Sequence, residues 1–102
     1  MATMDDDDVE IPSLGDACDQ ITDHSYRPDD LTLERWDRML RTPHICAESK
    51  DQIARIIRIR AATVSVAALM LRYCPCSISL DRALTALHDS QLQAITAIQA
   101  NE

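Results

Sequence analysis

The chain has 102 residues and a formal net charge of −7, because 17 aspartates and glutamates outnumber 10 lysines and arginines. This charge argues against DNA or RNA as a broad-surface partner, since neutralising a phosphate backbone needs a basic face. Arginines interrupt the most apolar stretch before it reaches the ~18 to 20 residues that span a bilayer, so we expect no membrane segment. The acidic amino terminus does not resemble a signal peptide, and we expect a cytoplasmic protein.

Residues 1–25 are expected to form an acidic, flexible tail. They open with four consecutive aspartates in MATMDDDDVE, and IPSLGDACDQITDH adds Pro, Gly and further acid without an apolar period. Runs of like charge usually stay solvated and do not enter a core. We therefore place the folded domain in residues 26–102, a size at which a single core is marginal and self-association is a common remedy.

The segment SYRPDDLTLERWDRMLRT, residues 25–42, is typical of a short helix. Asp29 or Asp30 can cap its start, and Pro43 ends it, so that a loop follows. With no phenylalanine and one tryptophan in the chain, large aromatic burial cannot carry the fold, and Ala, Ile and Leu must supply most of the core. The apolar residues at helical spacing in this segment are Leu31, Trp36, Met39 and Leu40.

Two longer helices are predicted after the loop. Ser49 or Asp51 would cap the first, which runs to about Tyr73. Pro75 breaks the chain, and Ser77 or Ser79 would cap the second. The apolar stripes are Ile53, Ile56, Ile57, Val64, Ala67, Ala68 and Leu71 on one helix and Leu80, Leu84, Leu87, Ala94, Ile95 and Ile98 on the other.

A short break between two long helices predicts an antiparallel helical hairpin. No strand is predicted, because the helical stripe continues through the β-branched run TVSV. The expected fold class is therefore all-α: a short N-terminal helix followed by an antiparallel two-helix hairpin, assembling into a symmetric homo-oligomer.

Arg60 falls on the apolar stripe of the first long helix, since helix neighbours lie three and four residues apart. Taking an unpaired guanidinium out of water costs several kcal/mol. Three interpretations follow from the spacing. The side chain extends past the apolar surface to water, it pairs with a carboxylate of another subunit, or it binds a phosphate through its bidentate fork.

Short motifs follow one another through residues 52–102. Their residues are Gln52, Ile53, Arg55, Ile59, Arg60, Ala61, Cys74, Pro75, Ser77, Ala83, Leu84, Thr85, Leu87, Ala94, Ala97, Ile98, Asn101 and Glu102. In this order, and without a gap, they resemble the small phage proteins of the anti-CBASS cyclic-nucleotide sponge type. These proteins share a helical domain with the sponges that antagonise Thoeris defence. Each motif is weak alone, and the ordered set is more specific.

This resemblance implies an all-helical subunit that assembles into a homohexamer. It further implies pockets between subunits that hold cyclic dinucleotides and, in some members, separate pockets for cyclic trinucleotides. The implied function is non-enzymatic: the protein sequesters the second messenger of a bacterial defence system in the cytoplasm of the host cell. A sponge needs no nucleophile and no cofactor, only tight binding of a dilute ligand.

The resemblance also implies a set of ligand-binding residues. The family's basic position falls on Arg60, and its aromatic position falls on Ile45, next to His44. Tyr26 has family-like surroundings but lies further upstream. The predicted ligand-binding residues are Arg60, Tyr26, His44, Thr63 and Arg58.

Two further features bear on that prediction. Thr63 would add a hydroxyl donor near Arg60, or would bond to its own helix backbone. Where many relatives carry basic residues after the Cys-Pro-x-Ser turn, this chain has Ile78, Ser79 and Leu80. A trinucleotide pocket is therefore not expected at that turn.

Metal and catalytic sites have weaker support. The pairs His44/Cys46 and Cys74/Cys76 resemble zinc ligands, but a helix of about 23 residues, hence about 34 Å, separates them. We expect no metal site and reduced cysteines, with Cys18 exposed in the tail. The chain shows no Ser-His-Asp setting and no Gly-rich phosphate loop, so we expect no enzymatic activity.

A second function class explains the same helices. An adaptor or oligomerisation module that binds another protein would also present alanine-rich helical stripes to a partner helix. A sponge should carry ultraviolet-absorbing nucleotide after purification from cells that make it, whereas an adaptor should carry none.

Overall fold

The structure is a computed structural model that describes residues 11–23, 26–41 and 49–101. In these ranges the chain forms four helices and no strand. The prediction of an all-α fold is therefore confirmed. The helices are α1 (Leu14–Asp19), α2 (Asp30–Arg41), α3 (Lys50–Tyr73) and α4 (Ile78–Asn101).

Side-chain caps mark the starts of all four helices, and three of these starts were predicted. Oγ of Ser49 accepts a hydrogen bond from the backbone N–H of Gln52 at 3.1 Å at the start of α3. Oγ of Ser77 accepts one from the N–H of Leu80 at 3.1 Å at the start of α4. Oδ1 of Asp29 accepts one from the N–H of Thr32 at 2.7 Å at the start of α2. Since each cap satisfies an N–H that lacks an intrahelical partner, these predicted starts are confirmed.

Helix α3 ends where the proline was expected to end it. Cys74 has an extended backbone, with φ −114° and ψ 139°, and its N–H donates to the carbonyl of Met70 at 2.9 Å. The ring of Pro75 disfavours a helical conformation at the preceding residue. The chain therefore leaves α3 at Cys74 and re-enters a helix at Ile78.

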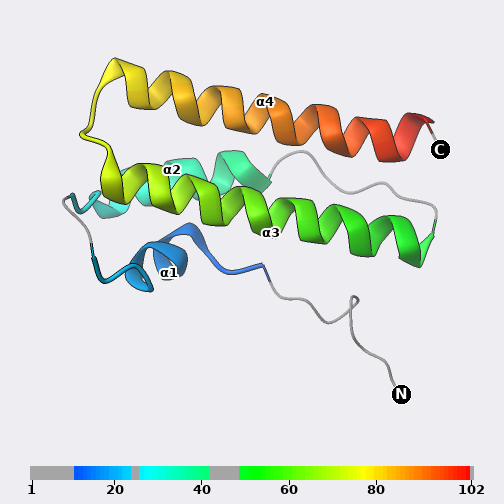
Figure 1. Cartoon of the computed structure of the whole chain (residues 1–102), viewed down its shortest axis with the longest axis horizontal. Coiled ribbons are helices and arrows are strands. Elements are labelled where there is room, and N and C mark those ends of the chain that lie inside the picture. Colours follow the sequence, from blue (N-terminus) through cyan, green and yellow to red (C-terminus); the bar gives the residue numbers. More distant parts are fainter. Residues whose placement is uncertain (1–10, 24–25, 42–48, 102) are drawn as a thin grey trace.

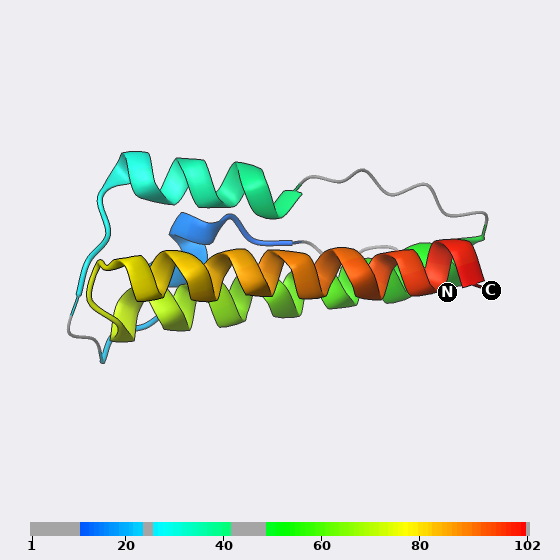
Figure 2. The ribbon, with the colours of Figure 1, turned by 90° about the horizontal axis from the view of Figure 1, so that it is seen from above.

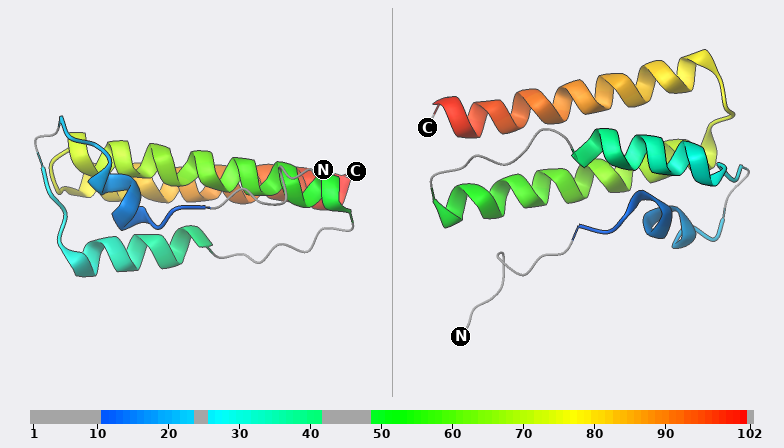
Figure 3. Two further views of the ribbon diagram at one scale, coloured as in Figure 1. Left: turned by 90° about the horizontal axis from the view of Figure 1, so that it is seen from below. Right: turned by 180° about the vertical axis from the view of Figure 1, so that it is seen from behind.

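Helices α3 and α4 lie side by side and run in opposite directions, joined by residues 74–77 (Figure 1). With 24 residues each, they are about 36 Å long. Figures 2 and 3 show α1 and α2 on one side of this pair, over the half that ends at the turn. The opposite side of α3 is not covered by another described element.

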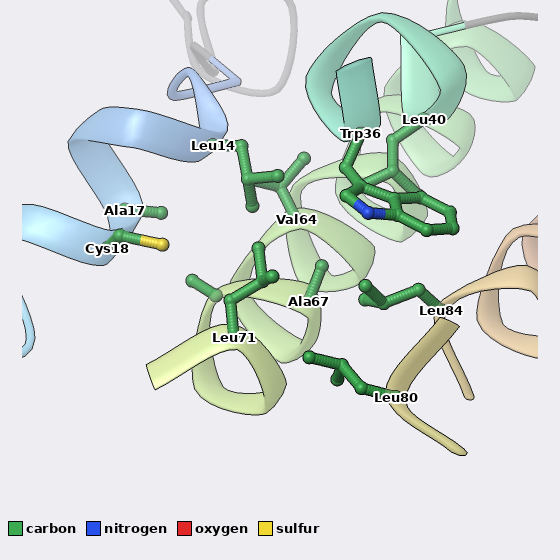
Figure 4. Packing of buried hydrophobic residues seen from close by; sticks show 11 residues of the cluster. Leu14, Ala17, Cys18, Trp36, Leu40, Val64, Ala67, Leu71, Leu80 and Leu84 are labelled. Atoms are coloured by element: carbon green, nitrogen blue, oxygen red, sulfur yellow. The ribbon is translucent and has the colours of Figure 1, made fainter. Parts of the chain in front are cut away.

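The main core lies where α1, α2 and α4 meet the second half of α3 (Figure 4). Trp36 is the largest residue in it and is almost fully buried between Leu40, Val64 and Leu84. Burying 150–250 Å² of indole surface stabilises the fold by about 4–6 kcal/mol at 25 cal/mol per Å². The remaining buried members are Leu14, Ala17, Cys18, Ala67, Ala68, Leu71 and Leu80.

Helix α1 corrects the expectation of a tail over residues 1–25. Leu14 and Cys18 are 0% and 1% exposed and belong to the main core, so the prediction of an exposed Cys18 is wrong. The backbone N–H of Leu14 donates to Oδ1 of Asp37 at 2.9 Å, which ties α1 to α2. A helix of six residues offers too few apolar positions to show a period, and the aspartates around it mask those few. Residues 1–10 lie outside the described residues.

The far half of the α3–α4 pair has a small cluster of its own. Ile56, Ile95 and Ile98 are buried there, with Ile59 packed against them. Among the described helices, none combines the length and apolarity needed to cross a membrane.

Candidate functional site

Arg60 lies on the buried face of α3, as its spacing predicted. Only 6% of its surface is exposed, so its guanidinium does not extend to water in this chain, and that interpretation is wrong. Nε of Arg60 donates a hydrogen bond to Oε1 of Gln91 on α4 at 3.1 Å. Burial lowers the pKa of the Arg60 guanidinium, and the positive charge of Arg41 lowers it further.

Gln91 continues this contact to a third helix. The residue is 2% exposed, and its Nε2 donates to the carbonyl of Leu40 at 3.1 Å. Leu40 lies in the last turn of α2, where helix carbonyls lack an intrahelical partner. We call this connection the Arg60–Gln91–Leu40 chain. It fastens α2, α3 and α4 of one chain together, which gives Arg60 a structural role.

The other basic and polar candidates on α3 have different environments. Thr63 is buried, and its Oγ1 donates to the carbonyl of Ile59 at 2.8 Å. This is the backbone-bonded arrangement weighed above for a helix threonine. Arg58 is on the exposed side of α3. His44 lies outside the described residues, so its predicted role stays a prediction.

Tyr26 borders a cavity. Its backbone N–H donates to the carbonyl of Arg72 at 3.1 Å, which holds the segment before α2 against the end of α3. The side chain is 42% exposed and lines a cavity of about 260 Å³. The other lining residues include Arg27, Asp29, Thr32, Trp36, Leu71, Cys74, Cys76, Leu80 and Asp81.

This cavity, the Tyr26 cavity below, has an apolar interior and a polar opening. Trp36, Leu71 and Leu80 are buried and supply its inner wall. Tyr26 and Arg27 are exposed and lie at the opening. An aromatic ring and a guanidinium beside an apolar recess can hold a planar molecule, because the ring stacks and the guanidinium binds oxygen. The carboxylates of Asp29 and Asp81 line the same cavity and oppose a negative charge there.

A single chain does not bring Arg60 and Tyr26 together. Arg60 is twelve residues before Arg72 on α3, and the carbonyl of Arg72 accepts the N–H of Tyr26. At 1.5 Å per residue this places the two sites about 18 Å apart along the helix. None of the cavities lined by Tyr26 or by α1 is lined by Arg60 or Thr63. The two predicted contacts would meet on one ligand only if they came from different subunits.

Arg72 is a second buried arginine, which sequence reasoning missed. It is 2% exposed, and its Nη2 donates to the carbonyl of Ile21 at 3.0 Å. Burial raises the pKa of the nearby Cys18 thiol, and the positive charge of Arg72 partly offsets this increase. Arg72 also lines a cavity of about 170 Å³, but Asp16, Asp19 and Asp30 line it too, so this cavity does not favour an anion.

Gln91 was missed as well, although its position could have revealed it. It lies seven residues after Leu84 and four before Ile95, so it occupies the apolar stripe of α4. A polar residue on such a stripe predicts a buried hydrogen-bond partner.

In the described part of the chain, no three histidine, cysteine, aspartate or glutamate residues come together as a metal site.

Comparison of the chain with protein-family models, with curated proteins and with solved structures found no match in any of the three.

Proposed function

We propose that this protein sequesters cyclic oligonucleotide second messengers, in particular cyclic dinucleotides, and thereby blocks bacterial anti-phage CBASS signalling without catalysing a reaction. The observation that carries the proposal is the Tyr26 cavity, because Tyr26, a predicted ligand-binding residue with an aromatic ring, lies at its opening. The motif order over residues 52–102, which resembles phage sponge proteins, supports the same function.

The size of the cavity suits one base of the ligand. Pockets for whole drug-sized molecules measure about 300–1,000 Å³, and the Tyr26 cavity measures about 260 Å³. The ring of Tyr26 would stack on the base, an interaction of about 1–3 kcal/mol. Arg27 would offer its fork to the neighbouring phosphate. In a symmetric oligomer, the second base of a cyclic dinucleotide would enter the same cavity of another subunit.

Arg60 enters the proposal through assembly. Its Nε is engaged with Gln91 inside the subunit, so a phosphate would share the guanidinium or take over this hydrogen bond. A homohexamer, as the resemblance implies, would allow Arg60 of one subunit to reach a ligand held at Tyr26 of another. Arg58, on the exposed side of α3, is the second basic candidate on this helix.

Calorimetric titration with a panel of cyclic di- and trinucleotides tests the proposal. We expect submicromolar binding for at least one ligand. Tyr26→Ala should weaken this binding by about 5- to 150-fold, which corresponds to a lost stacking energy of about 1–3 kcal/mol. Leu31→Ala is the control: Leu31 is 78% exposed but does not line the cavity.

Three outcomes contradict the proposal. A flat titration across the whole panel removes the sponge function. Equal weakening by Tyr26→Ala and Leu31→Ala removes the cavity as the site. Arg60→Glu is expected to abolish binding, so an unchanged affinity of this variant for the cyclic nucleotide would mean that Arg60 is not a ligand-binding residue. Circular dichroism and sedimentation must show that Arg60→Glu stays folded and assembled, since Arg60 is also a structural contact.

A second candidate function, a helical oligomerisation or adaptor module, is favoured by the outer face of α3. Ala62, Val66, Leu69 and Tyr73 are exposed and spaced four, three and four residues apart, so they share one side of the helix. This side is opposite the core. An exposed apolar stripe of this kind marks a surface for protein association, which the hexamer of a sponge and the partner of an adaptor would both use.

Sedimentation velocity separates these possibilities when it is combined with the titration. Leu69→Glu should dissociate an oligomer that uses this face, whereas Ser65→Glu, at its edge, should have a smaller effect. If Leu69→Glu dissociates the oligomer and the wild-type protein binds no cyclic nucleotide, the adaptor function is supported. An oligomer that binds nucleotide supports the sponge.

A further inference from the structure

Two exposed thiols flank the turn between the long helices. Cys74 and Cys76 are free, exposed and separated by Pro75, and both line the Tyr26 cavity. The motif that this turn resembles requires only the first cysteine, since its third position is variable. The second thiol is therefore a feature of this chain that neither the fold nor the proposed function explains.

The turn holds these cysteines in a defined geometry. The N–H of Cys74 donates to the carbonyl of Met70 at 2.9 Å. At the other end, Oγ of Ser77 donates to the carbonyl of Pro75 at 3.1 Å and accepts the N–H of Leu80 at 3.1 Å. The turn is thus fastened to both helices, so a ligand bound there would meet a preorganised site.

One ion can be shared by the two thiols. Pro75 alone separates Cys74 from Cys76, and both cysteines line the same cavity, so an ion there can take one sulfur from each. Two metal–sulfur bonds of about 2.3 Å, the length found for zinc thiolates, would place the sulfurs of a linear complex about 4.5 Å apart.

We propose that Cys74 and Cys76 form a two-thiolate site for a soft monovalent metal ion of the Cu(I) class. Thiolate ligands suit Cu(I), zinc and iron–sulfur clusters. Zinc needs four ligands in a closed structural site, and the described residues bring no three metal-binding side chains together. A two-coordinate ion requires only the pair at the turn.

The chemistry of binding is simple. Two Cu–S bonds form, the two thiols release their protons, and the resulting bis-thiolate complex carries one negative charge. The amino terminus of α4, a helix of 24 residues, begins at Ile78 and stabilises negative charge close by. Arg27 favours the anionic complex in the same way, while Asp29 and Asp81, which also line the cavity, oppose it.

Competition with a chromophoric chelator tests this site independently of the proposed function, because no nucleotide is present. Under anaerobic conditions, the reduced full chain is titrated with Cu(I), which ascorbate keeps in the monovalent state, in the presence of bicinchoninate. We expect one ion per chain. Cys74→Ser and Cys76→Ser should each lower the affinity at least 100-fold, because only one thiolate remains. Cys46→Ser is the control and should bind as the wild type does.

A second measurement needs no variant. Iodoacetamide followed by peptide mass mapping should label Cys74 and Cys76 in the metal-free chain and leave both unlabelled after Cu(I) is added. Full affinity in either turn variant, loss of affinity in Cys46→Ser, or unchanged labelling after copper overturns the proposal. So does one ion per two chains, because the site would then lie between molecules.

Discussion

The Arg60–Gln91–Leu40 chain predicts a large loss of stability when Gln91 is replaced by Met. The substitution keeps the approximate size of the side chain but removes the acceptor for Arg60 and the donor for the Leu40 carbonyl. A hydrogen bond to a charged group contributes about 1.5–3 kcal/mol and a neutral one about 0.5–1.5 kcal/mol. We expect Gln91→Met to lower the free energy of unfolding by about 2–4 kcal/mol.

That loss is large for a chain of this size. At about 0.05–0.15 kcal/mol per residue, 102 residues have a total stability of about 5–15 kcal/mol. Urea unfolding followed by circular dichroism, at one fixed protein concentration because assembly adds stability, measures the change. With a slope of about 1–3 kcal/mol per molar urea, the midpoint should fall by about 0.7–4 M.

Two comparisons make this prediction specific. Gln93→Met replaces an exposed glutamine of the same helix and should stay within about 0.5 kcal/mol of the wild type. The double variant of Arg60→Met and Gln91→Met should show a coupling of about 0.5–3 kcal/mol. If Gln91→Met is as stable as Gln93→Met, the hydrogen bonds of Gln91 do not hold the three helices together, and the reasoning is refuted.

Three further predictions concern α1, the start of α2 and the thiols. Leu14→Ala should lower the free energy of unfolding in urea by about 2–5 kcal/mol, whereas Leu31→Ala, at an exposed position, should change it little. Equal effects of the two variants would show that α1 is not part of the core. Hydrogen bonds from the backbone and side chain of Thr32 lower the pKa of Asp29 in the folded state. The ionised carboxylate therefore stabilises the fold at pH values above its ordinary pKa of 3.8. This contribution to stability disappears as the pH falls through the lowered pKa. The melting temperature of Asp29→Asn should therefore fall less steeply than that of the wild type below pH 4, and parallel curves would contradict this. Burial raises the pKa of the Cys18 thiol, so iodoacetamide should modify Cys18 only under unfolding conditions, and rapid modification of the native protein would count against its place in the core.

The helix boundaries were largely predictable because the signals that set them are local. Ser49 and Ser77 cap helices through hydrogen bonds to residues three positions away, and Pro75 acts on its immediate neighbour. The apolar period likewise placed Arg60 on the inner face of α3. What surrounds Arg60 was not predictable in this way, because Gln91 lies 31 residues further along the chain.

The missed features share this long-range character. Helix α1 is too short to show a period, and it became part of the core only because Trp36 and Val64 offered it an apolar surface. The Tyr26 cavity forms because the N–H of Tyr26 binds the end of α3 and brings together segments from three parts of the chain. The composition near the amino terminus is dominated by aspartate and predicted a solvated tail instead of a helix in the core.

By itself, the amino-acid sequence determined an all-helical chain with two long helices and a proline turn, because caps, prolines and apolar periods act over a few residues. The tertiary structure alone decided that Arg60 binds an amide of α4, that α1 enters the core, and that Tyr26 and two thiols share one cavity. These arrangements depend on contacts between residues up to 51 positions apart, whose formation is governed by shape and burial in three dimensions.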